Sequence, residues 1–160
     1  MTAKTVKQSQ TEISQLMMPQ HANLAGTVYG GTILSLADGV AYVCAARHAT
    51  PNCVTVSVDQ VDFREPIRIG ELITLKASVN YVGRTSMEIG IRIEAEDLKT
   101  GKKRHTNSCY FTMVALDEHR RPTPVPELIA ETPIEQKRMR AGKIRREHAR
   151  LLTEKRKALG

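Results

Sequence analysis

The stretch that decides the fold reads His21-Ala22-Asn23-Leu24-Ala25-Gly26-Thr27-Val28-Tyr29-Gly30-Gly31 and continues as Thr32-Ile33-Leu34-Ser35-Leu36-Ala37-Asp38. A polar loop ends in a glycine pair, and a long apolar helix is expected to follow. Glycine lets the backbone approach a ligand closely, and the first N–H groups of a helix lack acceptors at its positive end. Asp38 lies about two turns into this helix and is its only charge before Arg47. Free N–H donors and one isolated carboxylate are the groups needed to hydrolyse an activated carbonyl.

The helix itself is expected over residues 32–47, with apolar side chains around nearly its whole circumference. A helix of this kind must be covered by other parts of the protein. Gly39 lies inside it, where glycine costs about 1 kcal/mol relative to alanine. We therefore expect close packing at Gly39.

Alternation of apolar and polar residues predicts β-strands before and after the helix. The expected strands are residues 13–18, 53–63, 72–81, 87–95 and 105–116. One strand, one long helix and four strands of antiparallel type favour an α+β fold. In that fold a single buried helix is wrapped by one curled antiparallel sheet.

The 160 residues fit one domain with a flexible start and a helical end. Residues 1–11 are polar and are expected to be a flexible N-terminus, and residues 12–128 form the domain. Pro122, Pro124 and Pro126 break regular structure and mark its end. Residues 129–160 are expected to be a basic helical C-terminal extension.

The positive charge belongs to this extension. The whole chain carries a net charge of +7, and residues 131–160 alone hold ten Lys or Arg and four Glu. The extension has no aromatic side chains for base stacking and no recognisable nucleic-acid motif, so we expect no nucleic-acid partner. A solvated helix is the simplest interpretation.

Cysteine usage and hydropathy indicate the compartment. Cys44, Cys53 and Cys109 lack the spacing of a metal or redox motif and are expected to be small buried residues in a reducing environment. The longest apolar run, residues 40–46, is too short to cross a bilayer, and residues 1–12 do not resemble a signal peptide. A cytoplasmic protein without a membrane partner is expected.

Short motifs follow one another along the chain in a fixed order. They are Pro19-x-His21-x-Asn23-x-x-Gly26, Gly30-Gly31, Asp38, Arg47-His48, Val54-Thr55-x-Ser57-Val58-Asp59, Phe63, Pro66, Gly70, Gly83-Arg84-Thr85-Ser86-Met87, Val114-Ala115-Leu116-Asp117 and Pro122-x-Pro124-Val125-Pro126. In order and spacing, over roughly residues 12–128, the chain resembles the hotdog-fold acyl-CoA thioesterases of the cytosolic acyl-CoA hydrolase family. The resemblance implies hydrolysis of acyl-CoA to a free fatty acid and coenzyme A. It also implies a homodimer with active sites at its interface, often assembled into a trimer of dimers. No metal and no cofactor are implied beyond the coenzyme A of the substrate.

Asn23 and Asp38 match the catalytic pair of that family, and the start of the helix adds Gly31 as a third candidate. The N–H of Gly31 is expected to stabilise the oxyanion, and Asn23 to position the water or the carbonyl. Asp38, from the partner subunit, would act as general base or as nucleophile, and the sequence leaves both roles open. Without the resemblance, Asp38 could cap a helix break or face solvent, and Asn23 is a common turn residue.

Contact with coenzyme A is implied for Gly30 and for the four residues Gly83, Arg84, Thr85 and Ser86, where Arg84 would pair with a phosphate. An ordinary hairpin turn is the alternative at these four positions. The basic extension could reach the phosphates of coenzyme A or pack against a neighbouring subunit.

Two other functions compete with hydrolysis. One is a non-catalytic acyl-CoA-binding regulator with a hotdog fold, which the presence of both Asn23 and Asp38 disfavours. The other is a dehydratase acting on acyl thioesters, which would need a histidine close to its catalytic acid. Residues 32–46 contain none.

Overall fold

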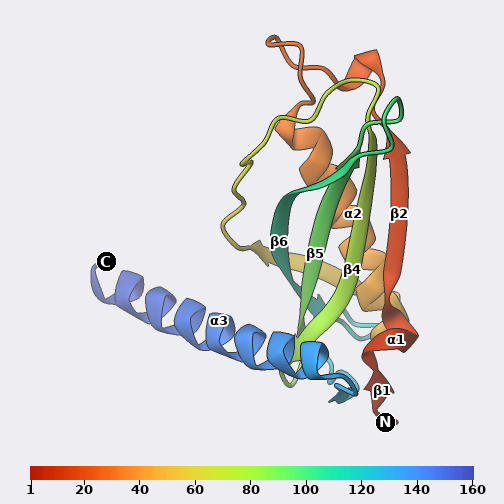
Figure 1. Ribbon diagram of the computed structural model, residues 1–160. Coiled ribbons are helices and arrows are strands. Elements are labelled where there is room, and N and C mark those ends of the chain that lie inside the picture. The colour runs from red at the N-terminus through yellow and green to blue at the C-terminus, as the bar shows by residue number, and fades with distance from the viewer.

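A five-stranded antiparallel sheet lies between two long helices in the computed structural model, which describes residues 1–160 (Figure 1). Its strands lie in the order β2-β4-β5-β6-β3. They are β2 (Thr11–Leu16), β3 (Cys53–Val58), β4 (Leu72–Val82), β5 (Ser86–Glu96) and β6 (Lys103–Ala115). The sheet curls around helix α2 (Gly30–His48), and helix α3 (Pro133–Ala158) lies across its other face. The predicted α+β fold is confirmed.

The core forms where α2 meets the concave face of the sheet. On α2 the buried residues include Ile33, Ala37, Val40, Ala41 and Cys44. The central strands supply alternate apolar residues, such as Ile89, Ile91 and Ile93 on β5. Because side chains of a strand point to alternate faces, the residues between them form the polar convex face. All three cysteines are buried and free, and burial raises the pKa of the Cys44 and Cys109 thiols to about 12.

One stripe of α2 is left uncovered within the chain. Ser35, Asp38, Gly39, Tyr42 and Val43 are exposed. No atom lies within 4 Å of a Cβ placed on Gly39. Within this chain nothing covers this stripe, and the close packing expected at Gly39 is absent. The apolar composition of α2 indicates which side chains favour burial. It does not indicate whether the same chain or another subunit covers those side chains.

Strand β3 forms one edge of the sheet and is shorter than expected. It ends at Val58, and its register shifts between Thr55 and Ser57. The alternating residues Val54, Val56 and Val58 remain exposed, with Val56 at 55%. The strand predicted from this alternation is present, but its alternating apolar side chains lie at the surface of the single chain.

The N-terminus differs from the expected flexible segment at residues 4–11. Strand β1 (Lys4–Thr5) pairs in parallel with β7 (Leu128–Ile129), and helix α1 (Val6–Ser9) buries Val6 and Ser9. Arg47 at the end of α2 donates to the carbonyl of Gln10 at 3.0 Å, which ties this segment to the core. The contact joins residues 37 positions apart, so a local pattern does not reveal it.

Helix α3 agrees with the basic helix expected at the C-terminus. Thr132 caps it: its hydroxyl accepts from Glu135 N while the Glu135 carboxylate accepts from Thr132 N. Only Gly142 is buried, and the second half of the helix projects beyond the sheet (Figure 1). None of the helices has the length and apolar composition needed to cross a membrane.

Candidate active site

The glycine pair stands where the loop enters α2. The aromatic rings of Tyr29 and Phe63 lie against it: a Cβ on Gly31 would come within 3.0 Å of Tyr29 ring atoms, and one on Gly30 would lie 3.4 Å from Phe63. No side chain caps this helix, and the N–H groups of Gly30 and Gly31 have no acceptor in the chain. The site thus presents two free donors at the positive end of a helix dipole.

Asn23 organises the preceding loop through its side chain. Its Oδ1 accepts from the N–H groups of Ala25 (2.9 Å) and Thr27 (3.1 Å), and its Nδ2 donates to Thr27 Oγ1 (3.0 Å). Gly26 closes the turn with a φ of +82°, which favours glycine. The amide oxygen is therefore occupied. The second hydrogen on Nδ2 has no acceptor in the chain, so Asn23 can donate a hydrogen bond outward.

A short η1 helix (Pro19–His21) precedes this loop and fixes His21. The ring Nδ1 of His21 accepts from Met18 N at 2.9 Å, and its backbone carbonyl accepts from Tyr29 N at 2.7 Å. His21 therefore stabilises the loop.

Asp38 lies on the exposed stripe of α2 and faces the start of β3. The hydroxyl of Thr55 donates to Asp38 Oδ1 at 2.6 Å. The sulfur of Met113 also lies within reach of Thr55 Oγ1, but the carboxylate is the stronger acceptor for its single hydrogen. This bond fixes the direction of the carboxylate. The sequence alone did not indicate Thr55 as a site residue, because a hydroxyl within an alternating strand has no distinctive sequence pattern.

Gly31 and Asp38 lie on one face of α2 but are well separated. Seven residues of helix correspond to two turns and about 10 Å along the axis. A reacting carbonyl must lie about 3 Å from both its oxyanion donor and the group that attacks it. A single chain therefore does not bring the two groups to one substrate carbon.

The hairpin Gly83-Arg84-Thr85-Ser86 joins β4 to β5 at the end of the sheet nearest β3's first residues. Its turn is closed by Gly83 N donating to Ser86 O at 2.8 Å. Ser86 pairs with Val114 of β6, and Val114 pairs with Val54 of β3. The hairpin therefore lies about two strand spacings, or roughly 10 Å, from Val54, the residue before Thr55. Arg84 is exposed and forms no ion pair, whereas Ser86 is buried. Of the hairpin side chains, Arg84 is the one free to meet a phosphate.

Comparison with known proteins identifies the family. The model of the thioesterase superfamily matches residues 25–102. The protein VdlD of Helicobacter pylori is 45% identical over 91% of this chain and 83% of its own length. The human cytosolic acyl coenzyme A thioester hydrolase is 38% identical over 87% of this chain, which covers 37% of the human protein.

Solved structures show the same fold over the whole chain. A hexameric acyl-CoA thioesterase has a TM-score of 0.91 and 34% identity, with full coverage of both chains. The acyl-CoA hydrolase of Staphylococcus aureus, solved with butyryl coenzyme A and coenzyme A, has a TM-score of 0.87 and 31% identity, over 98% of this chain and 96% of that one. Variants of that enzyme have one asparagine, one aspartate or one threonine replaced by alanine.

The structure thus has one curled sheet around one helix, free N–H donors at the start of that helix and a lone carboxylate two turns further along it. On these similarities the chain belongs to the thioesterase superfamily, within its acyl-CoA thioester hydrolase family.

Proposed function

We propose that the protein hydrolyses acyl-CoA thioesters, using Asn23 and Gly31 of one subunit and Asp38 of its partner. The observation that carries this proposal is Asp38 itself, an acid on an otherwise apolar helix stripe that is oriented by Thr55. It lies too far along α2 from Gly31 of its own chain to share a substrate carbon. A second copy facing the same stripe would supply the missing group to each site.

The free N–H of Gly31 would donate to the thioester oxygen as it becomes an oxyanion. Such a donor is typically worth about 10²–10³ in rate, and the helix dipole adds to it. The unengaged hydrogen on Asn23 Nδ2 would hold the same carbonyl in place, because its amide oxygen is already occupied. Asn23 can therefore act only as a donor, and we assign its N–H to the carbonyl.

Asp38 would provide the attacking oxygen, either by taking a proton from water or by direct attack. The leaving group is a thiolate, which departs without a strong general acid. Thr55 is a positioning residue, since its hydroxyl reaches the reaction only through the Asp38 carboxylate.

The residue spacing of a relative supports these assignments. The asparagine, aspartate and threonine replaced in the Staphylococcus aureus hydrolase are separated by 15 and 17 positions. Asn23, Asp38 and Thr55 are the same three residue types with the same two separations. We infer that the three residues form one functional unit here.

The exposed apolar surface supports assembly. Tyr42 and Val43 on α2 and Val54, Val56 and Val58 on β3 form a surface that a second copy would bury. Free backbone groups along the β3 edge would pair with the same strand of the partner. A dimer built this way, repeated as a trimer of dimers, would match the hexamer of the relative.

Coenzyme A binding is assigned to Gly30 and to the hairpin of residues 83–86, where Arg84 would meet a phosphate. No cofactor or metal enters the proposed reaction. A cytoplasmic location is proposed from the human relative, which is described as cytosolic.

The decisive experiment measures free-thiol release from short-, medium- and long-chain acyl-CoAs. Asp38→Asn should lower kcat by about 10²–10⁴-fold, the usual contribution of a general base. Asp97→Asn is the matched control, because Asp97 lies in the β5–β6 turn, where an amide oxygen can still accept from Lys99 N. Unchanged turnover in Asp38→Asn would refute the role of Asp38. No hydrolysis by the wild-type protein despite acyl-CoA binding would refute the proposal as a whole and favour a non-catalytic binding protein.

A further inference from the structure

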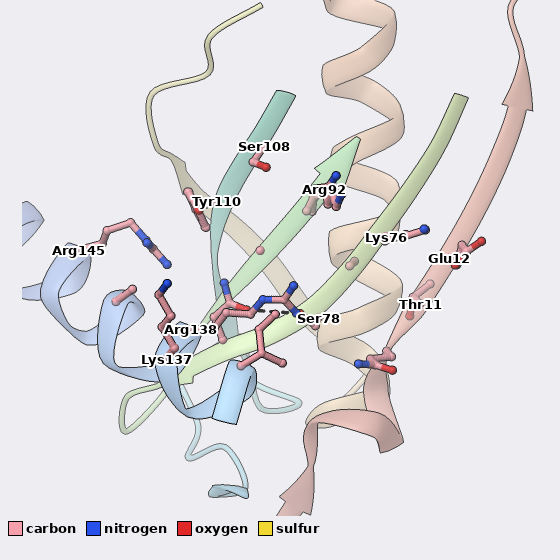
Figure 2. Close-up of a pocket in the computed structure, with 17 residues that line it drawn as sticks. Thr11, Glu12, Lys76, Ser78, Arg92, Ser108, Tyr110, Lys137, Arg138 and Arg145 are labelled. Carbon is pink, nitrogen blue, oxygen red and sulfur yellow. Dashed lines mark hydrogen bonds between the residues drawn. The ribbon is translucent and has the colours of Figure 1, made fainter. Parts of the chain in front are cut away.

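A second concave site lies on the opposite face of the sheet from Asp38. It is a cavity of about 600 Å³ between the convex face, β2 and the first half of α3 (Figure 2). This volume lies within the range of small-molecule sites, about 300–1,000 Å³. Neither α2, nor β3, nor the hairpin of residues 83–86 lines it. It is therefore separate from the candidate active site.

The floor of the cavity includes small residues on three neighbouring strands. Ser78 of β4 lies opposite Gly90 of β5, and Ser108 of β6 lies opposite Arg92. The Ser78 hydroxyl donates to Asn80 Oδ1 at 3.3 Å, and the Asn80 amide lies over Gly90. The Ser108 hydroxyl can donate to a bound group. The sheet thus forms a polar floor with one hydroxyl donor.

Positive charge converges on this hollow from two sides. Lys76 and Arg92 rise from the sheet, and Lys137, Arg138 and Arg145 extend from α3 over it (Figure 2). Glu12 is the only carboxylate in the lining.

Carboxylates outside the lining neutralise only part of this charge. Arg145 is bound to Glu88 by two hydrogen bonds, at 2.7 and 3.0 Å. Lys76 and Arg92 share the single carboxylate of Glu94, at 3.1 and 2.8 Å. Two cations with one anion leave a net charge of +1 on that wall.

The remaining cations have no role in docking α3. Lys137 and Arg138 form no salt bridge, whereas Arg145 and Gly142 already hold the helix against the sheet. With Glu12 counted, the cavity keeps a net charge of about +2 from groups that face one another, which is unfavourable without an anion between them. A bound dianion would relieve this repulsion.

We propose that the cavity binds the phosphate groups of a small pyrophosphate-bearing molecule. Lys137, Arg138, Lys76 and Arg92 would contact the phosphates by charge-assisted hydrogen bonds. Gln10, Thr11 and Glu12 form a polar wall that would meet hydroxyl or amino groups on the rest of the ligand. The inference does not depend on the proposed hydrolysis.

The first test is calorimetric titration of the full-length protein with inorganic pyrophosphate at low salt. One equivalent should bind per chain. The double variant Lys137→Glu/Arg138→Glu should bind at least about tenfold more weakly, a loss of one or more charge-assisted bonds. The control is Arg140→Glu/Lys143→Glu, which makes the same charge change on the same helix outside the lining and should retain wild-type affinity. No binding by the wild type, or equal losses in both variants, would overturn the proposal.

The second test separates a free ligand from coenzyme A, which carries a pyrophosphate of its own. The titration is repeated with coenzyme A at saturation. Undiminished pyrophosphate binding supports the cavity as a site for a separate molecule. Abolished binding supports coenzyme A as the occupant if Lys137→Glu/Arg138→Glu also weakens coenzyme A. Abolished binding with unchanged coenzyme A affinity in that variant would show that pyrophosphate had occupied the active site, and would overturn the proposal.

Discussion

Helices α2 and α3 pack on opposite faces of one sheet by different physics. α2 has 19 residues, contains one carboxylate before Arg47, and is held by apolar burial. α3 has 26 residues and buries only Gly142. It is held largely by the ion pair of Arg145 with Glu88 and by the stacking of Arg145 on Tyr110, 3.7 Å from the ring centroid.

The difference concerns the surface beside each helix. The contacts of α3 with the sheet are polar, and Arg145 finds its partners Glu88 and Tyr110 within the chain. The α2 side keeps an exposed apolar stripe next to the edge strand β3, and Asp38 lies on that stripe. The proposed chemistry is therefore on the side that needs a second copy, and four changes can test this contrast.

The largest effect is expected from a charge on the α2 side. Val56→Glu would place a carboxylate on the exposed β3 edge, where the proposed dimer buries it. We expect dissociation to monomers by analytical ultracentrifugation and a loss of turnover of about 10²-fold or more. Ile144→Glu changes an apolar position on α3 that is 66% exposed, and it should keep both assembly and activity. A dimeric, active Val56→Glu protein would contradict the assignment of this surface.

The α3 side should respond to the loss of one buried ion pair. Glu88 is 8% exposed, so Arg145→Met would leave its charge uncompensated and cost about 3–5 kcal/mol at the helix interface. Faster hydrogen exchange over residues 133–145 would report the undocking. Arg150→Met removes an exposed pair with Glu154 and should cost less than about 0.5 kcal/mol. Equal protection in the two variants would show that Arg145 does not hold the helix.

A smaller effect on catalysis is expected at Thr55. Thr55→Val keeps the shape but removes the hydrogen bond to Asp38, worth about 1.5–3 kcal/mol for a charged acceptor. We expect kcat to fall at least about tenfold with little change in KM, because Thr55 does not touch the substrate. Thr112→Val, on the neighbouring strand β6, serves as control. A change confined to KM would exclude the positioning role.

The smallest effect is a pH dependence of stability from His48. This side chain is buried at the end of α2, its Nε2 lies 3.0 Å from the carbonyl of Pro126, and desolvation lowers its pKa. Near pH 6.5 the unfolded state therefore binds a proton that the folded state does not. The contribution of His48 to the free energy of unfolding is complete above about pH 6.5. It falls as the pH drops further, by at most about 1.4 kcal/mol per pH unit.

Urea unfolding at pH 7.5 and 5.5 would measure this dependence. His48→Asn should lose less stability between the two pH values than the wild type does. The carboxylate of Glu71, whose pKa is held low by Arg104, stays ionised in this window and does not contribute. Equal losses in the two proteins would contradict a neutral, buried His48.

Local patterns were enough to predict most of the fold. The alternation of β4, β5 and β6 and the glycine pair before α2 placed the main elements within a few residues. The helical extension after the prolines was also predicted, and in the structure Thr132 and Glu135 form a capping box at its start. These features depend on residues close together in the sequence, where propensity and capping dominate.

Contacts between distant residues were not predictable in the same way. The ordered segment of residues 4–11 depends on Arg47 and on pairing with β7. Thr55 was missed because its partner Asp38 lies 17 residues away on another element. The roles of Asn23, Gly31 and Asp38 stay predictions, because Asp38 lies two turns along α2 from Gly31 of the same chain.

The most direct test of a composite site is subunit complementation. Asn23→Ala and Asp38→Ala proteins, each inactive alone, are mixed, dissociated and reassembled. Random pairing gives a population in which half of the dimers contain one subunit of each variant. Each mixed dimer has one of its two sites with both Asn23 and Asp38 intact. About a quarter of the wild-type rate should therefore return. If Asn23 and Asp38 act within one chain, no mixture regains activity, and the shared site at the α2 interface is contradicted.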